Sequence, residues 1–134
     1  MTLKWYGAEA NKRIRTETNQ RIDRASRILR DFIRIKLSRS QPVKLYGKKA
    51  GRSRKGMAPS KAGEYPKKVT GYLRMNVQAE MSHVTHTARV GTNVKYGKYL
   101  ELGTRKMARR PWLSRGMFDA RHKIIAMLKR GKVI

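Results

Sequence analysis

The sequence predicts an α+β fold in a single domain that covers residues 1–134. Three observations lead to this prediction. A long proline-free segment with helical periodicity comes first, two stretches of alternating apolar and polar residues stand in the middle, and a second helical segment follows them. A basic loop rich in Ser, Gly, Lys and Arg separates the first helix from the strands.

The first predicted element is a helix from Thr2 to Leu37. This segment contains no proline, and its only glycine is Gly7. Arginines dominate its polar face, and acids supply i,i+4 partners in two pairs, Glu17–Arg21 and Asp23–Arg27. The apolar residues recur at helical spacing and define the face that should be buried: Ile22, Ala25, Leu29 and Phe32, with Ile14, Ile28, Ile33 and Ile35 on this stripe or beside it.

Residues 38–68 predict a long mobile basic loop. Pro42, Pro59 and Pro66 interrupt it, and no acid lies between Asp31 and Glu64. Structureless connections of this length are uncommon in compact domains unless they are functional. Two interpretations stay open: a solvated tether, or an arm that becomes ordered on phosphate or on a neighbouring subunit. Candidate contacts to phosphate or a partner are Lys48, Lys49, Arg52, Arg54 and Lys55.

The middle of the chain predicts an antiparallel hairpin. Apolar and polar residues alternate over Tyr72–Ser82 and again over His83–Val90, which is the period of half-buried strands. Gly91-Thr92-Asn93 is predicted to be a turn.

Two further helices are predicted after this hairpin. The first is short, Tyr96–Leu102, and Gly103 suits its C-terminal cap. The second follows Pro111 with helical spacing to Arg130, and Gly131 is its stop.

The charge of the chain restricts its function classes. The chain has 34 Lys and Arg against 8 Asp and Glu, a net charge of +26. Since like charges repel and large aliphatic residues are few, we expect the chain to depend on nucleic acid, acidic protein surfaces or its own copies. The absence of cysteine excludes disulfides and suits a reducing compartment. No apolar run is long enough for a membrane span or a signal peptide, so we expect a soluble protein without a membrane partner.

The sequence does not predict an enzyme. His83 and His86 fall on opposite faces of a predicted strand, and no carboxylate accompanies them at a metal-ligand spacing. His122 stands alone, and the acids are scattered. The segment from Gly91 to Lys98 departs from a phosphate-binding loop, since its glycines are spaced too widely and Tyr99 stands where Ser or Thr should hold magnesium. We therefore predict no catalytic residue, no cofactor and no metal site.

Several short motifs between Gly63 and Leu113 resemble one known family. They are Gly63-Glu64-Tyr65-Pro66, Thr70-Gly71-Tyr72-Leu73-Arg74, Val90-Gly91-Thr92, Tyr96-Gly97-Lys98-Tyr99-Leu100-Glu101-Leu102-Gly103-Thr104 and Arg110-Pro111-Trp112-Leu113. Their order and spacing are similar to those of the tail-completion proteins of tailed bacteriophages, which join head and tail in the neck. Gly97 replaces the alanine usual in that family, and Leu102 and Trp112 replace phenylalanines.

The resemblance implies a structural virion protein that forms an oligomeric ring in the phage neck and joins the head/portal connector to the tail. Sixfold symmetry is expected, with twelvefold as a second possibility. The implied partners are neighbouring neck, connector and tail proteins, and genomic DNA that passes through the ring without sequence-specific contacts. The implied location is the virion, after assembly in the host bacterial cytoplasm. The alternative, which depends on charge alone, is a nonspecific nucleic-acid-binding structural protein of ribosomal or nucleoid type.

The motif residues themselves predict scaffold roles. Gly71 should turn the chain into the first strand, Gly91 should end the hairpin, Gly103 should let the chain reverse, and Pro111 should fix the backbone before the last helix. We also predict that Glu101 pairs with Arg110, which the family-like motif places beside it; the alternative is a surface acid with a screened partner. The full set of structural motif residues is Thr70, Gly71, Gly91, Thr92, Tyr96, Tyr99, Glu101, Gly103, Thr104, Arg110, Pro111 and Trp112.

Overall fold

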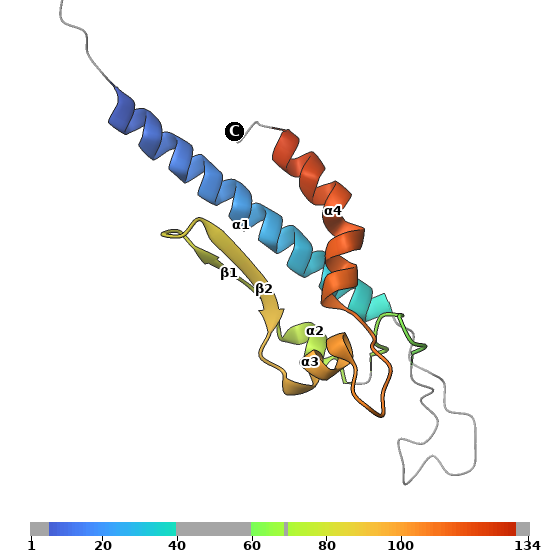
Figure 1. Cartoon of the computed structure of the whole chain (residues 1–134). Helices are drawn as coiled ribbons and strands as arrows, with labels where there is room; N and C mark the ends of the chain where they lie inside the picture. Colours follow the sequence, from blue (N-terminus) through green and yellow to red (C-terminus); the bar gives the residue numbers. More distant parts are fainter. Residues whose placement is uncertain (1–5, 40–59, 69, 131–134) are drawn as a thin grey trace, which may run out of the picture.

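A computed structural model describes residues 6–39, 60–68 and 70–130 of the chain (Figure 1). In these ranges the elements are α1 (Gly7–Arg39), α2 (Tyr72–Met75), β1 (Val77–Ser82), β2 (Thr87–Thr92), α3 (Lys95–Leu102) and α4 (Leu113–Lys129). The two strands form an antiparallel sheet. The predicted α+β fold is therefore confirmed.

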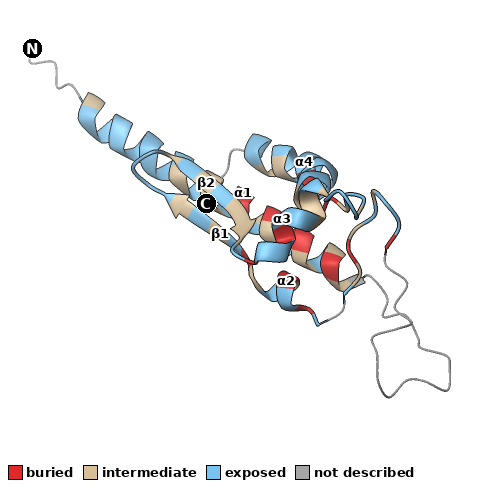
Figure 2. Cartoon of the chain, turned by 60° about the horizontal axis from the view of Figure 1, so that its bottom comes forward, coloured by how far each residue is buried: buried red, intermediate tan, exposed pale blue. Residues whose placement is uncertain are grey.

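Helix α1 is the element against which most of the described structure packs. The hairpin and α4 pack against it, as Figure 1 shows. Its buried stripe is Ser26, Leu29, Ile33 and Leu37, whereas residues 8–18 are all exposed (Figure 2). The predicted stripe is thus right at Leu29 and wrong at Ile14 and Ile35, which are exposed. Among the described residues, burial on α1 is therefore concentrated in its C-terminal half.

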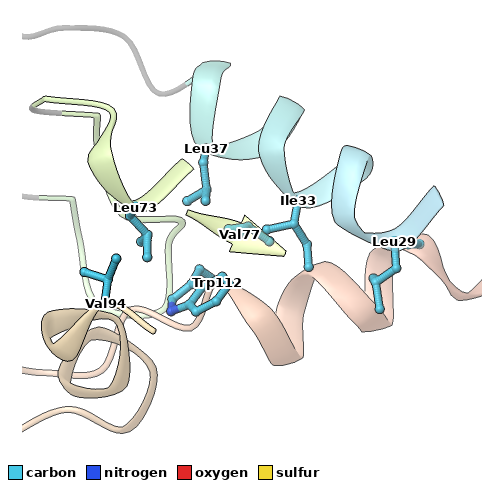
Figure 3. Packing of buried hydrophobic residues seen from close by; sticks show 8 residues of the cluster. Leu29, Ile33, Leu37, Leu73, Val77, Val94 and Trp112 are labelled. Atoms are coloured by element: carbon cyan, nitrogen blue, oxygen red, sulfur yellow. The ribbon is translucent and has the colours of Figure 1, made fainter. Parts of the chain in front are cut away.

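The hydrophobic core lies between the C-terminal half of α1, the segment α2–β1, the start of α3 and α4. Figure 3 shows Ile33 directed from α1 toward Val77 and Trp112. Gly116 allows α4 to approach α1 closely, because a Cβ atom at this position would lie 2.6 Å from Cγ1 of Ile33. The buried apolar residues are Leu29, Ile33, Leu37, Leu73, Val77, Val94, Trp112 and Ala120.

The first predicted strand begins later than the sequence indicated. Residues Tyr72–Met75 form the helical turn α2, which follows Gly71 at φ 80°, and the strand starts only at Val77. Leu73 and Val77 are buried while Met75 is exposed, a spacing that suits a helical turn and not a strand. The side chain of Asn76 donates a hydrogen bond to the carbonyl of Tyr72 (2.9 Å) and closes this turn. The prediction that Gly71 leads directly into a strand was therefore wrong.

The second predicted strand is shifted in the same direction. His83–His86 form the turn of the hairpin, and β2 continues through Gly91 and Thr92, which were predicted to be a turn. Asn19 on α1 holds this turn: its Nδ2 donates to the carbonyl of His83 (3.4 Å), and its Oδ1 is hydrogen-bonded to Nδ1 of His86 (2.7 Å). The turn where the chain reverses is thus bonded to a helix that is distant in the sequence.

The two later helices agree closely with their predictions. Helix α3 covers the predicted Tyr96–Leu102 with one more residue at its start, and α4 begins at Leu113 after Pro111. Helix α4 ends at Lys129, and the predicted stop Gly131 lies outside the described residues. In the part of the chain that the structure describes, we find no helix with the length and apolar character needed to cross a membrane.

The predicted loop over residues 38–68 lies mostly outside the described ranges. At its start, Ser38 belongs to α1. At its end, Ser60 is buried and Gly63 donates a backbone hydrogen bond to the carbonyl of Arg109 (3.0 Å). The candidate contacts Lys48, Lys49, Arg52, Arg54 and Lys55 all lie outside the described residues.

Candidate functional site: the junction between α3 and α4

The candidate site is built where α3 leaves the hairpin and turns toward α4. Gly97 makes this approach close, because a Cβ atom there would lie 2.8 Å from Cγ2 of Thr92 and 3.2 Å from Cδ1 of Leu73. The indole Nε1 of Trp112 donates to the carbonyl of Gly97 (2.9 Å). The buried tryptophan therefore fixes α3 against the start of α4 and has its polar atom satisfied.

Gly103 reverses the chain after α3, as predicted. Its φ is 80°, and its N–H donates to the carbonyl of Tyr99 (2.8 Å). A Cβ atom at this position would lie 3.0 Å from the backbone nitrogen of Arg109. Thr104 and Met107 then exchange backbone hydrogen bonds of 2.9 and 3.1 Å, which closes a tight loop. Glycine is required here by both its φ and the space available.

Glu101 caps the N-terminus of α4 from the neighbouring helix. Its Oε2 accepts hydrogen bonds from the backbone N–H groups of Trp112 (2.8 Å) and Leu113 (2.9 Å). Its Oε1 accepts the backbone N–H of Ser114 (3.1 Å) and the Ser114 hydroxyl. These N–H groups have no partner within a helix that begins at Leu113, and a negative charge there also complements the helix dipole.

The hydrogen bonds also set the protonation of this carboxyl group. Burial alone would raise the pKa of Glu101, but the hydrogen bonds from Ser114, Leu113 and Trp112 outweigh it and lower the pKa below its ordinary value. The charged form is therefore the one that the folded protein stabilises.

The predicted pair between Glu101 and Arg110 was wrong. Nε of Arg110 donates to the carbonyl of the buried Ser60 (2.8 Å), and its backbone N–H donates to the carbonyl of Leu100 (2.7 Å). Trp112, at the N-cap position of α4, makes no side-chain cap hydrogen bond. Because Trp112 is not Ser, Thr, Asp or Asn, the sequence indicates that a residue outside this position must accept the first N–H groups of α4.

An open groove of about 530 Å³ lies beside this junction. Its lining is mostly apolar and includes Val94, Leu102 and Trp112. Tyr99 and Leu102 are 54% and 68% exposed, so both present large side chains to solvent. The groove also contains Lys95 and Lys98, and among its lining residues Glu101 is the one acid.

A second cluster, on α1 and α4, combines cations with aromatic rings. Lys36 and Lys123 lie over the ring of Phe32, at 5.3 and 5.2 Å from its centroid. Arg115 lies 5.2 Å from the ring of Tyr65, whose hydroxyl donates to Asp119 (2.8 Å). Burial and this hydrogen bond raise the pKa of Tyr65. The cluster thus holds several positive charges in defined positions on one surface.

The structure brings together some of the predicted motif residues and separates others. Glu101, Gly103, Thr104, Pro111 and Trp112 meet at the junction, whereas Tyr96 and Tyr99 are exposed on α3. The remaining residues have local roles: the hydroxyls of Thr70 and Thr92 accept backbone N–H groups two residues later in the chain.

His83 and His86 lie in the hairpin turn. Within residues 6–39, 60–68 and 70–130, no group of three His, Asp or Glu side chains is arranged to hold a metal ion.

We compared the chain with family models, with curated proteins and with solved structures, and none of the three comparisons gave a match.

Proposed function

We propose that the chain is a structural protein whose copies form a ring in the neck of a tailed bacteriophage and join the head/portal connector to the tail. The similarity of residues 63–113 to tail-completion proteins supports this proposal. The observation that carries the assembly step is a second apolar stripe on α4, which the described part of the monomer leaves exposed.

Helix α4 is apolar on more of its circumference than the monomer buries. Its inner face contains Gly116 and Ala120. Beside this face lie Met117, Phe118, Ile125 and Leu128, which are 39–62% exposed. Phe118, Ile125 and Leu128 follow the spacing i, i+7, i+10 and so share one side of α4, where Arg121 lies 4.4 Å from the centroid of the Phe118 ring. An exposed apolar stripe of this kind on a soluble helix favours a contact with another subunit.

Helix α1 provides a second surface for assembly. Its N-terminal half extends past the end of α4 in Figure 1, and residues 8–18 are exposed on every side. Helices of about this length are marginally stable in water without tertiary contacts. Packing between subunits would stabilise this half, and repeated contacts between different faces close a ring when the rotation permits.

We predict that the isolated protein is monomeric or polydisperse at low salt and that rings form at high protein concentration or against a neighbouring neck ring. The reason is that a net charge of +26 opposes self-association, and salt screens this repulsion. Light scattering across salt and protein concentrations measures the assembly, and electron-microscopy class averages give its symmetry. A monomer that is stable at every salt concentration and never enters purified virions would contradict the proposal.

The α4 stripe is tested by Ile125→Asp. We expect this change to raise the protein concentration needed for half-maximal assembly about tenfold, because an unpaired carboxylate would enter the subunit interface. The matched control is Val84→Asp, which changes the charge equally at a hairpin-turn side chain that is 89% exposed. Equal assembly of the two variants would show that the stripe is not an interface.

The alternative function, nonspecific nucleic-acid binding, is favoured by the cation–aromatic cluster around Phe32 and Tyr65. For a ring through which a genome slides, we expect weak DNA affinity, because tight phosphate contacts would hold the genome in place. Each phosphate contact adds about −0.9 to the slope of log K against log salt. Fluorescence titration of a duplex at several salt concentrations measures this slope. Strong or sequence-selective binding that persists at high salt would favour the alternative.

A further inference from the structure

The groove beside α3 combines an apolar wall with uncompensated positive charge. Tyr99 and Leu102 are more than half exposed along it, and Val94 and Trp112 are buried behind them. Exposed aromatic and aliphatic side chains next to a buried tryptophan are typical of the centre of a protein–protein interface. The α4 stripe proposed for self-assembly does not contribute to this groove.

The charge of the groove is positive because the carboxylate of its one acid, Glu101, is bonded to the start of α4. Lys95 and Lys98 belong to the lining. The oxygens of Glu101 accept hydrogen bonds from Trp112, Leu113 and Ser114, so this carboxylate neutralises the start of α4 and not the lysines. Arg105, Lys106 and Arg109 are exposed on the loop that follows α3.

These features select among the classes of partner. A second copy of the chain carries the same net charge of +26 and would bring further positive charge to the groove. A nucleic acid would satisfy the lysines, but its phosphates would leave the 68% exposed side chain of Leu102 without apolar contacts. A protein segment with both acidic and large apolar side chains satisfies the lysines and covers the apolar wall.

We propose that this groove binds an acidic, amphipathic segment of a different protein, with apolar side chains against Leu102 and Tyr99 and carboxylates against Lys95 and Lys98. The inference rests on the proposed function, because a ring that joins two structures must bind a protein other than itself. It adds the place and the chemistry of that contact.

The test uses the full chain and a fluorescein-labelled synthetic helical peptide with glutamates on one face and leucines on the other. We expect binding by fluorescence anisotropy, and binding about tenfold weaker for a peptide with serines in place of the leucines. A peptide with lysines in place of the glutamates should not bind. Equal binding of the acidic peptides with leucine and with serine would overturn the proposal, since charge alone would then explain it.

Matched variants locate the binding surface. Leu102→Ser and, separately, Tyr99→Ser should weaken peptide binding about tenfold, while Val84→Ser on the hairpin turn should leave it unchanged. Lys98→Gln should weaken binding more than Lys129→Gln, which removes the same charge from α4. Thermal melting confirms that each variant is folded. Equal effects within each pair would overturn the proposal.

Two further measurements separate the competing explanations. A labelled single-stranded oligonucleotide tests the nucleic-acid explanation. If it binds more tightly than the acidic peptide, and its binding depends on Tyr99 but not on Leu102, the partner of the groove is a nucleic acid and not a protein. Light scattering of the same variants distinguishes the two proposals. Unaffected peptide binding to the groove variants, together with normal ring assembly, would refute the groove and leave the ring. Normal peptide binding without any assembly would refute the ring and leave the groove.

Discussion

Replacing Gly116 with valine is expected to lower the free energy of unfolding by about 3 kcal/mol. The reason is the close approach of α4 to α1, since the new Cβ would lie 2.6 Å from Cγ1 of Ile33, a fully buried side chain. Gly116→Ala should cost about 1–2 kcal/mol, because the higher helix propensity of alanine offsets part of the same clash. Urea unfolding monitored by circular dichroism measures both values.

The matched control for this prediction is Gly91→Val. A Cβ atom at Gly91 would meet nothing within 4 Å, and valine suits a strand, so stability should change by no more than about 0.5 kcal/mol. A double-mutant cycle with Ile33→Ala isolates the contact: Gly116→Ala should cost much less when Ile33 is already truncated. Equal costs of Gly116→Ala in both backgrounds would show that the two helices have room to separate.

The sequence predicted most of the order and type of the elements, because the long helices have strong local signals. The stretch before Leu37 has no proline, and α4 has both helical spacing and Pro111 just before it. Helix α3 was also predictable within one residue at its start, since Gly103 marks its end. These features depend on residues that are near one another in the chain, so a sequence pattern contains them.

The hairpin was predicted with the wrong boundaries, because tertiary contacts set them. Alternation from Tyr72 to Val90 gives no local signal for a reversal. Asn19 is hydrogen-bonded to the turn, and Arg34 donates two hydrogen bonds (2.6 and 3.1 Å) to the carbonyl of Val77, the first residue of β1. Both contacts come from α1, which is distant in sequence.

The position of Glu101 at the junction between α3 and α4 was predicted correctly, but its hydrogen-bond partners were not. The motif placed Glu101 beside the segment at Arg110 and Pro111, and the structure places it there. A side-chain ion pair was expected because the family-like motif places Arg110 beside Glu101. The backbone N–H groups at the start of α4 are better partners, since no side chain at Trp112 satisfies them and their helix end attracts an anion.

Glu101→Ala is therefore expected to lower the free energy of unfolding by about 2 kcal/mol, because the first N–H groups of α4 lose their acceptors. The loss is moderate because Glu101 is only half-buried and water replaces part of the cap. Glu80→Ala, at an exposed acid on β1, is the charge-matched control and should change stability by no more than about 0.5 kcal/mol. The losses of stability caused by Arg110→Gln and Glu101→Gln should add in the double variant. A coupling energy above about 0.5 kcal/mol would show that the two side chains form the predicted ion pair.

The pH dependence of stability gives an independent readout of the same cap. The pKa of Glu101 is lowered in the folded protein from its ordinary value of 4.5, so its contribution is complete above about pH 4.5 and is lost as the pH falls through the lower folded value. The difference in unfolding free energy between the wild type and Glu101→Gln should therefore be constant from about pH 7 to pH 5 and shrink toward about pH 3. Urea unfolding at each pH measures this difference. A difference that stays the same down to about pH 3 would mean that the charge on Glu101 does not hold α4 in place.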